Sequence, residues 1–123
     1  MYTLDTNAII YYLKGDKKAV EVLESLFKRN LPIYISCITE LELFSFPDLT
    51  KKEVVRINEL LQTLNIIPVD SQLARLASFL RSKSKIKTPD SIIAATAVFT
   101  GSILLTRNVK DFEKVVLVQV QEL

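Results

Sequence analysis

The chain opens with Met1-Tyr2-Thr3-Leu4-Asp5-Thr6-Asn7, a short apolar run that ends in an acid. Further acids recur in or near the first turns of later helical patterns, at Glu42, Asp90 and Asp111. In a sheet of parallel strands, the carboxyl ends of the strands and the first turns of the following helices open onto one edge, where ligands bind. We therefore expect these four acids, the acid cluster, to meet at that edge.

Short apolar runs alternate with helical patterns along the whole chain. We predict strands at 2–4, 33–36, 66–69, 103–106 and 115–120, and helices at 6–13, 16–30, 38–46, 50–64, 70–82 and 88–101, with a turn or short helix at 108–114. Strands separated by helices pair in parallel through right-handed crossovers. The predicted fold class is α/β, a three-layer α/β/α sandwich with a central, mainly parallel sheet. With 123 residues, we expect one domain over 1–123.

Local signals mark several helix boundaries. Gly15 is expected to end the first helix, and Asp16 to cap the second. Thr50 and Glu53 have the spacing of a capping box, and Thr88 precedes Pro89 as a cap precedes the first helical residue.

The composition excludes several classes of chemistry. The sequence has no histidine, which rules out Ser-His-Asp and Cys-His catalysis and histidine acid–base pairs. A single cysteine, Cys37, forms neither an internal disulfide nor a cysteine-rich metal site, and two glycines cannot supply a glycine-rich phosphate loop. The excess of 16 Lys and Arg over 14 Asp and Glu is too small to indicate a partner. The carboxylates are the chemical groups that remain.

No targeting segment is visible. The first strand begins at residue 2 without a basic n-region, and the uncharged stretch 91–106 is shorter than the roughly 20 residues of a membrane span. A cytoplasmic location is the expectation.

Each acid also has a structural explanation when taken singly. Asp5 is placed to cap the helix that begins at Thr6, Asp90 complements the dipole of its helix, and Asp111 follows Asn108 in a capping pattern. Their shared position at the carboxyl edge makes the joint functional interpretation stronger. Four carboxylates in one place repel one another. Bound Mg²⁺ or Mn²⁺ commonly relieves this repulsion, because both ions prefer oxygen ligands.

Four motifs in order resemble those of the PIN domain family, and closely the VapC-type toxin ribonucleases, over essentially the whole chain. The first is Leu4-Asp5-Thr6-Asn7, a strand that ends in Asp-Thr-Asn. The second is the strand Ile35-Ser36-Cys37-Ile38-Thr39 followed by Glu42-Leu43. The third is Asp90-Ser91-Ile92-Ile93-Ala94-Ala95, and the fourth is Thr106-Arg107-Asn108-Val109-Lys110-Asp111-Phe112.

The resemblance implies a Mg²⁺- or Mn²⁺-dependent endoribonuclease that cleaves single-stranded RNA by means of a metal-activated water. Asp5 and Asp90 are expected as primary metal ligands, and Glu42 and Asp111 as further ligands or groups that orient the water. Four polar residues are expected to surround these acids: Thr6, Asn7, Thr106 and Asn108. The resemblance also implies a homodimer that binds a cognate antitoxin, with a segment of the antitoxin in the catalytic groove.

The chain departs from the family pattern after Glu42-Leu43, where Phe44-Ser45-Phe46-Pro47 stands in place of an early glycine. Glu40 competes with Glu42, because residues two apart on a helix point about 200° apart and only one faces a given cleft. The family spacing favours Glu42.

A run of basic residues precedes Asp90 and is called the basic segment: Arg81, Lys83, Lys85 and Lys87. It is a candidate for tracking the RNA backbone beside the acids, with a solvated loop as the competing interpretation. Three tyrosines, Tyr11, Tyr12 and Tyr34, are candidates for base stacking or for core and interface contacts.

Other acidic Mg²⁺ pockets fit the sequence less well. A phosphoacceptor receiver domain needs an adjacent acid pair after the first strand, and a haloacid-dehalogenase-type phosphatase needs Asp-x-Asp, whereas residue 7 is Asn. The remaining alternative is a non-catalytic PIN-like scaffold that binds RNA or protein.

Overall fold

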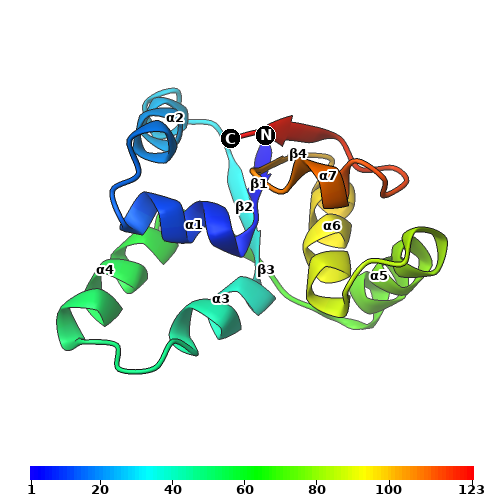
Figure 1. Cartoon of the computed structure of the whole chain (residues 1–123), viewed down its shortest axis with the longest axis horizontal. Helices are drawn as coiled ribbons and strands as arrows, with labels where there is room; N and C mark the ends of the chain where they lie inside the picture. The colour runs from blue at the N-terminus through cyan, green and yellow to red at the C-terminus, as the bar shows by residue number, and fades with distance from the viewer.

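The structure, a computed structural model, covers residues 1–123 and contains five strands and seven helices (Figure 1). Their order along the chain is β1 (Tyr2–Leu4), α1 (Thr6–Leu13), α2 (Lys17–Lys28), β2 (Ile33–Ser36), α3 (Cys37–Phe44), α4 (Lys51–Leu61), β3 (Asn65–Ile67), α5 (Ser71–Ser84), α6 (Thr88–Thr100), β4 (Ile103–Thr106), α7 (Val109–Phe112) and β5 (Val120–Glu122). None of these helices combines the length and the apolar character that a bilayer span requires.

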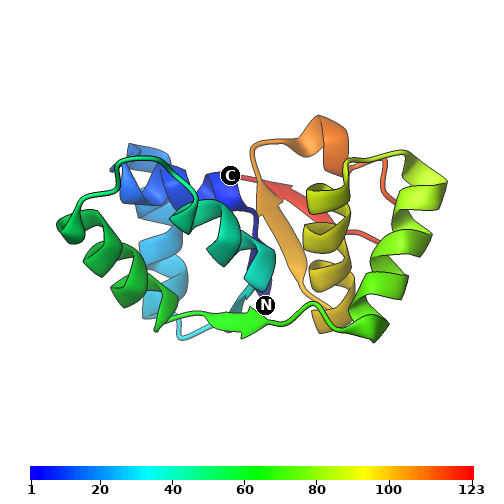
Figure 2. The ribbon, with the colours of Figure 1, turned by 90° about the horizontal axis from the view of Figure 1, so that it is seen from below.

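The five strands form one sheet in the order β3-β2-β1-β4-β5, and every pair is parallel. The predicted α/β class with a parallel central sheet is confirmed. Helices α1, α2 and α4 lie on one side of the sheet and α5 and α6 on the other, as the two perpendicular views show (Figures 1 and 2). Because β1 is central, its carboxyl end is surrounded by neighbouring elements.

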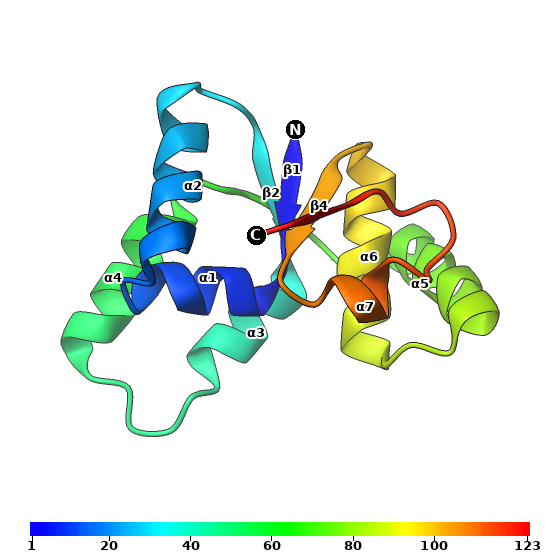
Figure 3. The same ribbon diagram turned by 45° about the horizontal axis from the view of Figure 1, so that its top comes forward.

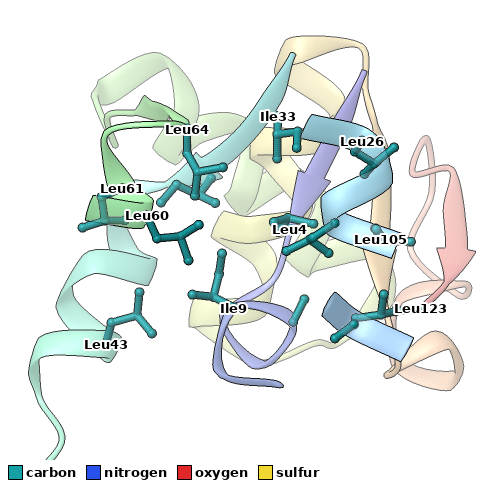
Figure 4. Packing of buried hydrophobic residues seen from close by; sticks show 14 of the residues in the cluster. Leu4, Ile9, Leu26, Ile33, Leu43, Leu60, Leu61, Leu64, Leu105 and Leu123 are labelled. Carbon is teal, nitrogen blue, oxygen red and sulfur yellow. The ribbon is translucent and has the colours of Figure 1, made fainter. Parts of the chain in front are cut away.

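Alternating strand residues supply the two sides of the core. Leu4 and Leu105 pack with Ile9 and Leu26 beneath α1 and α2 (Figure 4), whereas Leu104 packs with the α5 and α6 residues. All of these leucines except Leu26 are fully buried. The sheet is therefore covered on both faces, and the edge where we predicted the acids to meet is the one where the strands end.

Most of the predicted helix boundaries are confirmed at atomic detail. The carboxylate of Asp16 accepts a hydrogen bond from the backbone N–H of Ala19 at 3.1 Å and caps α2. Thr50 and Glu53 form the complete capping box at the start of α4. These contacts satisfy backbone donors that the first turn of a helix leaves free.

The predicted strand at 115–120 is wrong in extent, since the observed strand β5 covers Val120–Glu122. Leu117 has a φ of 69°, and the N–H of Val115 donates to the carbonyl of Phe112 at 3.0 Å. This apolar stretch is a turn because its buried member, Val115, packs with Phe112 against the α5 and α6 side.

Two smaller boundaries also differ from the prediction. The strand expected at 66–69 is Asn65–Ile67, set by its pairing with β2. Thr88 does not cap α6: Lys87 occupies the cap position without a side-chain hydrogen bond, and Thr88 is already helical. The hydroxyl of Ser91 donates to the Thr88 carbonyl instead, at 2.6 Å.

Candidate active site

The carboxyl ends of β1, β2 and β4 point to one end of the molecule, where α1, α3 and α7 begin (Figure 3). A cavity of about 490 Å³ lies there. It is lined by Asp5, Thr6, Asn7, Ile10, Leu41, Glu42, Ser45, Phe46, Asp90, Ile93 and Asn108. Three of the four predicted acids therefore open into the same space.

Asp5 is the innermost acid, with 5% of its surface exposed. One carboxylate oxygen accepts from the backbone N–H of Ala8 at 2.8 Å and caps α1, and the other accepts from the Thr106 hydroxyl at 2.5 Å. Burial raises the pKa of Asp5, against the lowering effect of these two hydrogen bonds, and the charge on Glu42 raises it further. Asp5 thus caps α1 as predicted and also lines the cavity.

Glu42 reaches the cavity from α3. Its carboxylate accepts a hydrogen bond from the Thr6 hydroxyl at 2.5 Å, and the Thr6 hydroxyl also contacts that of Thr39 at 3.1 Å. Glu40 is half-buried but does not line the cavity, in keeping with the opposite directions of the two side chains.

Asp90 lies in the first turn of α6 and is half-buried. Burial raises its pKa, followed by the negative charges on Glu42, Asp111 and Asp5, whereas Lys87 lowers it. The four acids therefore interact electrostatically at one place, although Asp111 itself does not line the cavity. Asp111 is exposed and accepts from the side-chain amide of Asn108 at 3.1 Å.

No ion pair offsets the charge of the acid cluster. The ion pair in the chain joins Arg107 to Asp16, and none of the four acids takes part in one. No three of the acids are close enough to hold an ion directly between them as the side chains stand. The donor set consists of carboxylate oxygens, the ligand type that Mg²⁺ and Mn²⁺ prefer.

The predicted polar residues occupy two kinds of position. Thr6 and Thr106 are buried and hold carboxylates, whereas Asn7 and Asn108 line the cavity with more exposed side chains. Asn108 was also expected in a capping pattern, but it makes no side-chain cap and binds Asp111 instead.

The basic segment covers the last turn of α5 and the loop before α6. The Nε of Arg81 donates to the carbonyl of Ile86 at 3.0 Å, and the ammonium of Lys83 lies 5.8 Å from the ring centroid of Phe79. Lys87 is close enough to Asp90 to lower its pKa. All four basic side chains are exposed.

The three tyrosines are engaged in contacts within the chain. Tyr11 stacks with Arg107, Tyr12 packs edge-on against Phe27 and donates to Glu24, and the Tyr34 hydroxyl contacts Met1. Tyr11 and Tyr12 are partly buried against the core, whereas Tyr34 is partly buried without belonging to either core cluster.

Sequence reasoning missed two features of the site. Ile10, Leu41, Phe46 and Ile93 give the cavity an apolar wall, which the spacing of α1 and α3 side chains alone did not reveal. Arg107 lies within the fourth motif, but its role was not predictable, because its partners Tyr11 and Asp16 lie on the α1–α2 corner, far away in sequence.

Comparison with known proteins identifies the family. The model of the PIN domain matches residues 2–116. This chain belongs to the PIN domain family. It is 30% identical over 130 residues to Ribonuclease VapC1 of Haemophilus influenzae strain R2866, covering 99% of this chain and 97% of that protein.

Solved structures agree with this assignment to a PIN-like fold. VapBC2 from Rickettsia felis, bound to a DNA fragment from its promoter, matches with a TM-score of 0.85 and 25% identity over 99% of this chain and 98% of that one. A toxin–antitoxin complex from Klebsiella pneumoniae matches with a TM-score of 0.80 and 33% identity over 96% and 95%.

Proposed function

We propose that this PIN domain is an endoribonuclease that cleaves single-stranded RNA with the help of Mg²⁺ or Mn²⁺, and that it is the toxin of a toxin–antitoxin pair. The observation that carries the proposal is the convergence of Asp5, Glu42 and Asp90 on one cavity, with Asp111 near enough to raise the pKa of Asp90 and no ion pair to any of the four. The relatives named as VapC ribonucleases and VapBC complexes support the RNA substrate and the antitoxin partner.

Asp5 and Asp90 would hold the ion, with Glu42 and Asp111 as further ligands or groups that orient the attacking water. When bound, the ion activates water and offsets negative charge on the scissile phosphate and the leaving oxygen. Without such a cation, the formal charge of the acid cluster repels an RNA phosphate.

The chain's own residues fix the direction of these carboxylates. The Ala8 N–H and the Thr106 hydroxyl hold both oxygens of Asp5, which leaves its remaining lone pairs toward the cavity. The Thr6 hydroxyl restrains Glu42 in the same way. Removing a group that supports a metal ligand by a hydrogen bond commonly lowers metal affinity by about 10- to 100-fold, and a loss on that scale is expected when either hydroxyl is removed.

The basic segment, which is exposed and precedes Asp90 in the chain, would contact RNA phosphates that flank the cleavage site. Lys87 is the best placed of the four, because its charge lowers the pKa of Asp90. The whole chain, 1–123, then acts as one nuclease domain in the cytoplasm, as a homodimer whose activity the antitoxin blocks.

The direct test is cleavage of a single-stranded RNA by purified protein in Mn²⁺, with and without EDTA. Asp5→Asn should abolish cleavage, and Glu40→Gln should leave it largely intact as a matched acid-to-amide control on α3. RNA binding without cleavage by the unaltered protein in metal would instead support the non-catalytic scaffold.

A further inference from the structure

Arg107 belongs to the motif that carries Thr106 and Asn108, yet it does not line the cavity. Its guanidinium reaches the corner between α1 and α2. There Nη1 donates to one oxygen of Asp16 at 3.0 Å and Nη2 to the other at 2.5 Å, and the guanidinium carbon lies 4.3 Å from the ring centroid of Tyr11. This arrangement combines a bidentate ion pair with a cation–π contact.

The partners of Arg107 are themselves held in place by hydrogen bonds. Asp16 caps α2 through the Ala19 N–H, and its own N–H donates to the carbonyl of Tyr11 at 3.0 Å. About two-thirds of the Arg107 and Asp16 side chains is covered, since they are 31% and 32% exposed. The Arg107 hydrogen bond holds the pKa of Asp16 down to about 2. Bidentate, stacked arginine pairs are more specific in geometry than ordinary surface ion pairs.

The segment that follows Arg107 has little stability of its own. Helix α7 has only four residues, and its cap position, Asn108, makes no side-chain cap. A helix of this length does not persist alone because one turn fixes many dihedral angles for few hydrogen bonds. Phe112, 1% exposed, anchors its far end in the core. At the near end, Thr106 is held in β4 by its pairing with β5, and Arg107 is the first residue beyond the strand.

This segment carries several contacts of the site. The Thr106 hydroxyl donates to Asp5 and accepts from the Asn108 N–H at 2.9 Å, and the Asn108 side chain donates to Asp111. Thr106 is held in β4 by its pairing with β5, so a shift of the Arg107 backbone would chiefly move Asn108, which follows it in the chain. The contacts of Asn108 to Thr106 and to Asp111 would then change at once.

We infer that Arg107 is a positioning residue: its contacts with Tyr11 and Asp16, here called the clamp, fix the 108–112 segment so that Asn108 and Asp111 are held beside Asp5 and Asp90. The consequence for catalysis rests on the proposed ribonuclease function. The guanidinium fork is already occupied by Asp16, so the clamp, rather than a contact to RNA phosphate, accounts for Arg107 in this motif.

Three variants test the clamp in the full-length protein. Arg107→Met removes the charge and the fork, Arg107→Lys keeps the charge without the fork, and Asp16→Asn removes the anion but keeps an oxygen that can cap α2. Lys110→Met is the matched control, since it removes a basic charge from an exposed position on α7.

In Mn²⁺ and saturating RNA, Arg107→Met should lower kcat per folded molecule by about 10- to 100-fold with KM for RNA unchanged, the scale expected when a reacting group is misplaced by about 1 Å. Arg107→Lys and Asp16→Asn should fall between it and the unaltered protein. Lys110→Met should match the unaltered protein. An unchanged kcat with a raised KM would identify a phosphate contact and overturn the clamp.

Amide hydrogen exchange provides a readout that needs neither metal nor activity. Arg107→Met and Asp16→Asn should speed exchange at Asn108 and Phe112, whose N–H groups bond to Thr106 and Asn108, and leave Ile9 in the core unchanged. Unchanged exchange at Asn108 and Phe112 would overturn the inference. If the unaltered protein fails to cleave RNA, the proposed function fails, whereas this exchange result still decides the clamp.

Discussion

Replacing Asp90 by Asn should have opposite effects on the stability of the metal-free and metal-loaded protein. Asp90 is half-buried, forms no ion pair, and has its pKa raised by burial and then by the charges on Glu42, Asp111 and Asp5. The variant removes a charge that destabilises the metal-free fold. It also removes an expected metal ligand, so the stabilisation that the metal provides should disappear.

The expected rise in Tm on metal binding follows from the binding equilibrium and from the length of the chain. An ion at ten times its dissociation constant stabilises the folded state by about 1.4 kcal/mol. For 123 residues the unfolding entropy near the melting temperature is about 0.26 kcal/mol per degree. Saturation of the site to this degree should therefore raise Tm by about 5 °C in the unaltered protein.

The effect of pH has a definite sign. The raised pKa of Asp90 means that the folded protein holds this proton more tightly than the unfolded chain, for which the pKa is 3.8. The destabilisation is absent below the unfolded pKa and develops as pH rises through the folded pKa. The gain in metal-free Tm from Asp90→Asn should be present at pH 7 and vanish near pH 3.

Thermal unfolding by circular dichroism, with EDTA or with Mn²⁺, measures both effects. Asp48→Asn is the control, because Asp48 is exposed, does not line the cavity and has a φ of 60° that asparagine tolerates. An equal Mn²⁺ shift in Asp90→Asn and the unaltered protein would refute the reasoning, since the ion would then bind elsewhere.

Three further predictions concern individual groups of the site. Glu42→Gln should abolish RNA cleavage with no loss of metal-free Tm, whereas Glu40→Gln should retain most activity; the reverse result in a cleavage assay would reassign this ligand to Glu40. Thr106→Val removes a fully buried hydroxyl that donates to Asp5, and it should lower the free energy of unfolding in urea by about 1.5–3 kcal/mol. Thr106→Ser keeps the hydroxyl and should not. Equal destabilisation by both variants would argue against the hydrogen bond. Neutralising the basic segment should reduce the log–log salt slope of RNA binding by about 0.7 for each RNA phosphate that the protein no longer neutralises, and an unchanged slope would make it a solvated loop.

The fold was predictable because its signals are local. The alternation of apolar runs and helical patterns identified four of the strands nearly at their observed limits, and Asp16 and the Thr50–Glu53 box marked helix starts. The prediction failed at 115–120, because an apolar composition is typical both of a strand and of a partly buried turn. The left-handed backbone at Leu117 is set by tertiary packing and has no signal in the residue type.

The gathering of three of the four acids at one cavity was predictable, but the contacts that support them were less so. Strand-end position and motif spacing led to Asp5, Glu42 and Asp90, which the structure places around one cavity. The hydrogen bond from Thr106 to Asp5 and the clamp of Arg107 join segments about 90 to 100 residues apart, and no periodicity in the sequence connects such pairs. They follow from the parallel order of β1 and β4.

The chemistry of the RNA ends tests the central claim most directly. The protein should be given a defined single-stranded RNA in Mn²⁺, and the products should be identified by mass spectrometry. If a metal-activated water attacks the phosphorus, the products carry 5′-phosphate and 3′-hydroxyl ends. Ends with a 2′,3′-cyclic phosphate would show attack by the ribose hydroxyl and would contradict the account, even if the protein cuts RNA efficiently.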